Sequence, residues 1–235
     1  MKQRKRWIPI AAILFAVTEL VLGIMAHTAH RPTMAHARYA IVLLAFLFCF
    51  LFFERSLSYL FTQLALLATV AADYILILHN EYGFLLAVLL FTVAQLAYAA
   101  RLLAGEAPTL RRRHLAVRLL LSVGAISVGS LALGEAADAL SLVALFYFAN
   151  LVTNAVFAVF EKESRGVFAT GLLLFVLCDI FMGFGMLGTY LPVGHGALIR
   201  FLTSPPLDMA WVFYPPSQAL LALSLLPRSI KKATV

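Results

Sequence analysis

Two aspartates stand alone in long apolar segments of this chain. Asp73 is the one charged residue of LLATVAADYILIL (66–78), and Asp179 is the one charged residue of LLLFVLCDIFMGF (172–184). An ionised carboxylate at the middle of a membrane helix costs about 2.5–3.5 kcal/mol, and such residues usually mark pathways or reactive sites. Two carboxyl groups close together in an apolar setting have different pKa values, so that one can act as an acid and the other as a base. The pair therefore suits a substrate that reacts through an oxocarbenium ion, as glycosidase substrates do.

The scaffold that positions these aspartates is predicted to be a membrane domain. Of the 235 residues, 63% are hydrophobic and 12% are charged, a composition typical of polytopic membrane proteins. Segments of about 20 apolar residues, the length that crosses a bilayer core, recur along the chain. We expect an all-α integral membrane protein, with residues 1–235 as a single transmembrane domain. The eight predicted spans are 7–26, 38–54, 56–78, 82–103, 115–134, 139–160, 165–188 and 206–226.

The basic residues predict how these spans are oriented. Fifteen of the 18 Lys and Arg residues fall on the side of the amino terminus, and only Arg31, Arg38 and Arg200 fall on the other. By the positive-inside rule both termini are predicted to be cytoplasmic. The expected location is a bacterial inner membrane. The net charge of +7 and the RRRH segment at 111–114 are interpreted as topology determinants beside anionic lipids, not as a nucleic-acid site.

Polar residues indicate which face each helix buries. The spans must be helical because backbone groups in lipid have to be paired internally. At 100° per residue, Thr69 and Asp73 share one face with Ser58 and Thr62. Similar stripes on other spans comprise Gln95 and Tyr98, Tyr147 with Asn150 and Asn154, and Tyr214 with Gln218. Asp73 and Asp179 both fall in the outer half of outward-running spans, so we expect a polar pocket at that depth.

Other site chemistries have little support in the sequence. Zinc sites need histidine or cysteine ligands, and the predicted spans leave all six histidines in loops or at helix ends. The chain contains neither a G-x-S-x-G motif nor a phosphate-binding glycine loop. No metal site and no cofactor are therefore predicted, and Asp73 and Asp179 remain the candidate catalytic residues.

The order of several motifs resembles the YhhN-type membrane proteins, which include the lysoplasmalogenases. Family members carry Gly-Asp and aliphatic residues on the third helix, and this chain has AADYILIL with Asp73. They continue with Phe, His and Tyr on the fourth helix, where this chain has Phe91, Gln95 and Tyr98. The later matches are Tyr147 in LFYFANLVTN, Gly171 and Asp179 in GLLLFVLCD, and Tyr214 and Gln218 in FYPPSQALLALS. Cys178 stands where serine is usual, and Gln95 where histidine is usual.

The resemblance implies an eight-helix hydrolase that cleaves the vinyl ether of lysoplasmalogens and releases a fatty aldehyde. Its partners would be a lysophospholipid or other lipid substrate and the membrane lipids. Asp73 and Asp179 would form the acid–base pair, and six residues would line the head-group end of the pocket: Gln95, Tyr98, Tyr147, Asn150, Tyr214 and Gln218. Glutamine cannot transfer protons as histidine does. Two alternatives therefore stay open, a small proton- or cation-coupled transporter and a non-catalytic lipid-binding membrane protein.

Overall fold

The computed structural model describes residues 2–28, 31–52, 56–79, 83–160, 165–190, 196–203 and 208–226. The described residues are almost entirely helical, and no strand occurs among them. The helices are α1 (Lys2–Thr28), α2 (Arg31–Cys49), α3 (Leu57–Asp73), α4 (Phe84–Ala104), α5 (Pro108–Leu133), α6 (Ala139–Phe160), α7 (Arg165–Tyr190), α8 (Ala197–Thr203) and α9 (Met209–Leu223). The prediction of an all-helical fold is confirmed.

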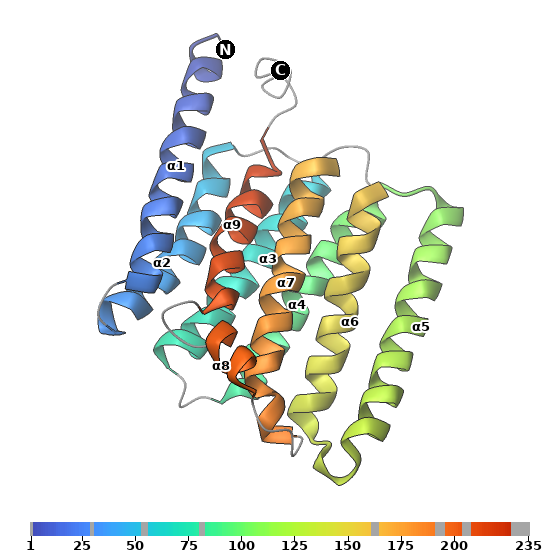
Figure 1. Ribbon diagram of the computed structural model, residues 1–235. Helices are drawn as coiled ribbons and strands as arrows, with labels where there is room; N and C mark the ends of the chain where they lie inside the picture. Colours follow the sequence, from blue (N-terminus) through green and yellow to red (C-terminus); the bar gives the residue numbers. More distant parts are fainter. Residues whose placement is uncertain are drawn as a thin grey trace.

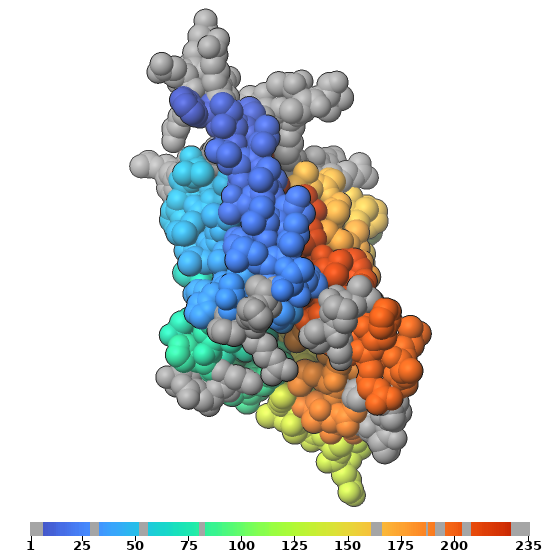
Figure 2. Space-filling model, turned by 60° about the vertical axis from the view of Figure 1, so that its left-hand side comes forward, coloured from blue at the N-terminus to red at the C-terminus, as the bar shows by residue number. Residues whose placement is uncertain are grey.

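Six helices form a closed ring around the core of the protein. In order around the ring these are α2, α3, α4, α6, α7 and α9, and α9 packs back against α2. Two helices lie outside this ring, α1 against α2 and α9, and α5 mainly against α6 (Figure 1). Figure 2 shows α1 on the outer surface of the molecule, beside α2. The long helices alternate in direction, so α1 begins and α9 ends on the same side of the bundle (Figure 1).

Six of the described helices are long and apolar enough to cross a membrane. They cover Trp7–Thr28, Leu57–Leu78, Phe84–Ala104, Pro108–Ala136, Ala139–Phe160 and Gly166–Tyr190. The apolar part of α2, Thr33–Cys49, is shorter, and α9 has 15 residues. The protein is therefore a helical membrane protein, while the eight-span topology with both termini cytoplasmic stays a prediction.

The ends of the helices differ from the predicted spans where polar residues extend a helix. α5 begins at Pro108, seven residues before the predicted span, because proline is well suited to the first turn of a helix. The arginines that follow are compatible with a helix beyond the apolar segment. The short helix α8 was not predicted. α3 ends at Asp73 and continues as a π-helical turn over Tyr74–Leu78, a feature that frequently occurs at functional sites.

Apolar residues fill the ring and also cover its outer surface. The largest fully buried side chains inside the ring include Tyr98, Phe168, Phe175, Leu172 and Leu151. Large apolar side chains are exposed along the outer faces of α1 and α5, among them Leu14, Leu20, Leu120, Val128 and Leu131. Such an outer surface is expected of helices that face lipid, because no water needs to be excluded there.

Candidate functional site

A cavity of about 530 Å³ lies inside one half of the helical ring, and both candidate aspartates line it. Its walls come from α3, α4, α6, α7 and α9, and Leu133 of α5 closes one edge. The volume falls in the range of small-molecule and cofactor pockets. The structure therefore brings Asp73 and Asp179 from distant parts of the sequence to one site.

The carboxyl group of Asp73 is held by a tyrosine that lies far from it in the sequence. Asp73 is the last residue of α3 and is 2% exposed. The Tyr214 hydroxyl, on α9, donates a hydrogen bond of 2.5 Å to Asp73 Oδ2. Because Tyr214 is itself buried, the phenol has few alternative acceptors, and the bond fixes the orientation of the carboxylate.

Asp179 is held in the same way by α6. The Tyr147 hydroxyl donates a hydrogen bond to Asp179 Oδ2. Tyr147 belongs to the polar stripe of α6, and Asp179 lies on α7, the next helix around the ring. Two aspartate–tyrosine pairs from four different helices therefore face one cavity.

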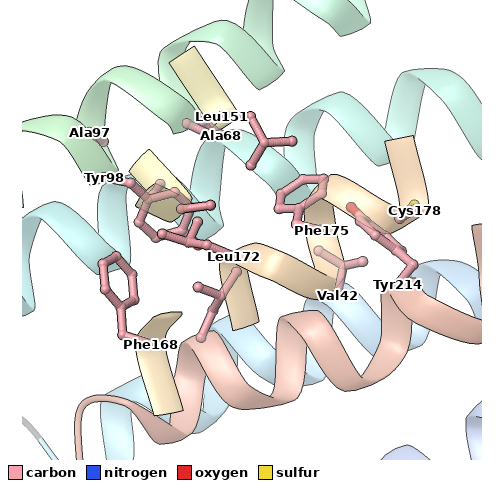
Figure 3. Close-up of a cluster of buried hydrophobic side chains, with 14 of the residues drawn as sticks. Val42, Ala68, Ala97, Tyr98, Leu151, Phe168, Leu172, Phe175, Cys178 and Tyr214 are labelled. Atoms are coloured by element: carbon pink, nitrogen blue, oxygen red, sulfur yellow. The ribbon is translucent and has the colours of Figure 1, made fainter. Parts of the chain in front are cut away.

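The rest of the cavity wall is aromatic and aliphatic. The ring of Phe91 lies between those of Tyr147 and Phe175, with centroids 5.9 Å and 6.2 Å away. Phe175 also packs edge-on to Tyr214 at 5.5 Å, and Figure 3 shows both rings directed into the same buried cluster. No lysine, arginine or histidine occurs among the described lining residues. The cavity suits hydrocarbon, with polar contacts concentrated at the two aspartates.

An ion pair borders the cavity next to α9. Arg38 on α2 donates a hydrogen bond of 2.7 Å from Nη2 to Asp208 Oδ2, and its guanidinium carbon lies 4.4 Å from the ring centre of Trp211. Trp211 lines the cavity, so Arg38 supports the wall without entering it. Asp208 has a backbone φ of +31°, a conformation rare outside glycine, and its ion pair holds it at the start of α9.

Four other predicted site residues lie outside the cavity wall. Gln95, Tyr98, Asn150 and Gln218 are fully buried but are not among the described residues that line the cavity. Gln95 and Gln218 lie one helical turn beyond the lining residues Phe91 and Tyr214. Direct contact of these four residues with a substrate head group stays a prediction. Among the described residues, no cluster of three or more His, Cys, Asp and Glu side chains is placed to hold a metal.

A buried polar network on α5 is the main feature that the sequence analysis missed. Arg118 donates from Nη1 to Asn150 Oδ1 and from Nη2 to Asn154 Oδ1, each at 2.6 Å, and its Nη2 lies 3.0 Å from His114 Nε2. The other ring nitrogen of His114 lies 3.0 Å from Glu106 Oε1. The prediction that every histidine lies in a loop or at a helix end was wrong for His36 and His114, because α2 and α5 start earlier than predicted.

The spacing on α5 could have revealed this network. His114, Arg118 and Ser122 are four residues apart and are the buried residues of this helix. Residues at that spacing share one helix face, and Asn150 and Asn154 form the matching stripe on α6. Counting Arg118 only as a topology charge concealed this pairing.

Three comparisons with known proteins bear on the family to which this chain belongs. A comparison with curated proteins and one with solved structures each gave no match. The model of the YhhN family matches residues 34–225, a range that includes Asp73, Asp179 and the tyrosines bonded to them. Because this match covers most of the chain, the protein belongs to the YhhN family.

Proposed function

We propose that this protein is a membrane-embedded hydrolase of lysolipids that cleaves the vinyl ether bond of lysoplasmalogens. The observation that carries the proposal is the presence of Asp73 and Asp179 in one largely apolar cavity. Membership of the YhhN family supports it as well. The alkenyl chain would occupy the apolar part of the cavity, with the ether oxygen near the aspartates.

The proposed reaction divides into a protonation and a hydration. One aspartic acid donates a proton to the outer alkene carbon, and the ether oxygen shares the positive charge of the resulting oxocarbenium ion. The other aspartate, ionised, takes a proton from water as the water oxygen bonds to the cationic carbon. The hemiacetal then collapses: its C–O bond to the alcohol breaks as the leaving oxygen takes the proton from the second aspartate, and its hydroxyl proton passes to the first aspartate. A fatty aldehyde remains, and both carboxyl groups are back in their starting states. The net reaction consumes one water and needs neither an oxidant nor a reductant.

The two tyrosines give this pair its geometry. Tyr214 and Tyr147 each donate to Oδ2 of their aspartate, so each carboxyl group is held in one orientation. Fixed donors and acceptors contribute most where water is scarce, because little reorganisation is needed when charge develops. The tyrosines are positioning residues in this proposal, and the aspartates are the catalytic residues.

The test is aldehyde release from lysoplasmenylethanolamine by the purified full-length protein in lipid nanodiscs. We expect Asp73→Asn and Asp179→Asn each to lower the rate at least about 100-fold, as expected for loss of general acid–base catalysis. Glu19→Gln is a matched control because Glu19 is likewise a buried carboxyl group in an apolar helix, α1, and does not line the cavity. The lysolipid with a saturated ether should not be cleaved, since it has no alkene to protonate.

Two outcomes would overturn the proposal. One is the absence of aldehyde with folded wild-type protein, which would favour a transporter or a non-catalytic lipid-binding protein. The other is full activity of both aspartate variants. Proton- or voltage-driven flux into liposomes, abolished by either variant, would identify the transporter.

A further inference from the structure

Polar side chains form a second layer inside the ring, one to two helical turns beyond the cavity residues Phe91 and Tyr214. Gln95 follows the cavity residue Phe91 by four positions on α4, and Gln218 follows Tyr214 by four positions on α9. Because α4 and α9 run in the same direction, both glutamines lie on the same side of the cavity (Figure 1). Gln95, Tyr98 and Gln218 each have no exposed surface. We call these three residues the polar layer.

The network on α5 sets the orientation of the first glutamine. Arg118 can only donate hydrogen bonds, so the oxygen of Asn154 must face it. The amide nitrogen of Asn154 then donates to the backbone oxygen of Gln95 at 2.8 Å and to its Oε1 at 3.0 Å. Gln95 therefore presents its NH₂ group, a pure donor, away from Asn154.

The polar layer contains several groups without a protein partner. Gln95 Nε2, the Tyr98 hydroxyl and both polar atoms of the Gln218 amide make no hydrogen bond to any residue that the structure describes. Leaving a buried donor or acceptor unpaired costs about 1–3 kcal/mol. Figure 3 shows Tyr98 directed into the core beside Phe168 and Leu172, so its hydroxyl lies deep inside the bundle. Groups this deep are normally satisfied by buried water.

The donors and acceptors define the class of ligand. Gln95 offers only donors, which would repel a cation, while Gln218 and Tyr98 offer donors and acceptors. Water satisfies both kinds of group, because it is small and able both to accept and to donate. We propose that the polar layer is a water-binding site.

This site has a role that rests on the proposed hydrolysis. The cavity wall is largely apolar, and a hydrocarbon chain that fills the cavity displaces water from it. Hydration of the oxocarbenium ion nevertheless consumes one water in each turnover. The polar layer supplies this water from the side of the aspartates opposite the bound chain.

Nuclear magnetic resonance can detect this water without any measurement of activity. The glutamines of the chain are Gln3, Gln63, Gln95 and Gln218, so a sample labelled with ¹⁵N-glutamine gives few side-chain amide signals. We expect cross-peaks between water and the side-chain amides of Gln95 and Gln218 in the wild-type protein. The signals are assigned with Gln95→Met and Gln218→Met, or with the corresponding glutamate variants where a methionine variant does not fold.

Asn150 provides the matched dry control. It is as buried as the glutamines, but its amide nitrogen donates to the backbone oxygen of Phe146 at 2.8 Å and lies 3.4 Å from Ser122 Oγ. In an asparagine-labelled sample its amide should show no cross-peak to water. If the side-chain amides of Gln95 and Gln218 also show no cross-peak to water, the water site is refuted, whatever the activity of the protein.

A kinetic measurement then tests the role of the water. Gln218→Met should lower kcat for aldehyde release about 10-fold with little change in KM, and Gln218→Glu, which keeps polar atoms, should recover most of it. Unchanged kcat in Gln218→Met would refute the role in supply. Water cross-peaks in a protein that releases no aldehyde would uphold the water site and reject the proposed hydrolysis.

Discussion

Tyr214 on α9 donates a hydrogen bond of 2.5 Å to Oδ2 of Asp73 on α3, across 141 positions of sequence. The two helices share few other contacts because α2 lies between them in the ring. This bond therefore connects the first aspartate to the helix that carries Trp211 and the paired prolines. It makes the geometry of the carboxylate depend on α9.

Replacing Tyr214 with phenylalanine should remove this bond and keep the ring packing. Hydrogen bonds to charged groups contribute about 1.5–3 kcal/mol, so we expect kcat for aldehyde release to fall roughly 10- to 100-fold. Tyr74→Phe is the control, because Tyr74 is 43% exposed, does not line the cavity and belongs to the π-helical turn directly after Asp73. Equal kcat values in wild type and Tyr214→Phe would show that the tyrosine does not position Asp73.

Replacing Arg118 with leucine should destabilise the protein strongly. The substitution leaves the oxygens of Asn150 and Asn154 buried without their donor. Breaking a buried charged contact typically costs about 3–5 kcal/mol, which thermal unfolding in one detergent can measure. Arg112→Leu, at an exposed position of the same helix, should have little effect. Similar unfolding temperatures for the two variants would contradict this prediction.

Gly171 should not tolerate alanine, because α7 and α9 approach closely there. An added Cβ would lie 3.0 Å from Leu221 Cγ and 3.2 Å from the Leu221 backbone nitrogen. Overpacking of this kind costs about 1–3 kcal/mol. Gly124→Ala, where no neighbouring atom lies within 4 Å of the added Cβ, should be neutral or stabilising by up to about 1 kcal/mol. If the Gly171→Ala and Gly124→Ala proteins are equally stable, the close approach of α7 and α9 at Gly171 is refuted.

Asp138 should make the start of α6 sensitive to acid. The backbone N–H of Ser141 donates to Asp138 Oδ1 at 2.7 Å, and this bond lowers the pKa of Asp138 below its ordinary value. The ionised carboxylate therefore stabilises the fold above a pH of about 4 and ceases to do so as the pH falls through the lowered pKa.

The difference in unfolding temperature between wild type and Asp138→Ala measures this effect. It should be constant near neutral pH and shrink in acid. Glu135→Ala removes a carboxylate from the same connection and should leave the α6 cap intact. If the difference in unfolding temperature between wild type and Asp138→Ala grows as the pH falls, the explanation is contradicted.

The depth of the aspartates and the tyrosines beside them could be inferred from sequence. Asp73 and Asp179 interrupt apolar spans that run in the same direction, and helical geometry alone places them at a similar level. Tyr147 and Tyr214 follow from the same reasoning, since each belongs to a polar stripe on its own helix. Periodicity identifies the buried face of a helix, and this information is sufficient to predict that these four side chains face the interior.

Contacts between helices could not be inferred in the same way. The face of α4 that carries Gln95 was predicted correctly as buried, but which residues line a cavity depends on how neighbouring helices pack. Arg118 was hidden by its charge, because a count of basic residues treats every arginine as a surface group. The π-helical turn after Asp73 leaves no periodic signal in an aliphatic segment.

The polar stripe of α5 also has a consequence for how the protein enters the membrane. The outer face of α5 is apolar, but the face with His114, Arg118 and Ser122 would be costly to expose to lipid. Its partners Asn150 and Asn154 are synthesised only with the next helix, α6. We therefore expect the two helices to enter the membrane together as a paired hairpin.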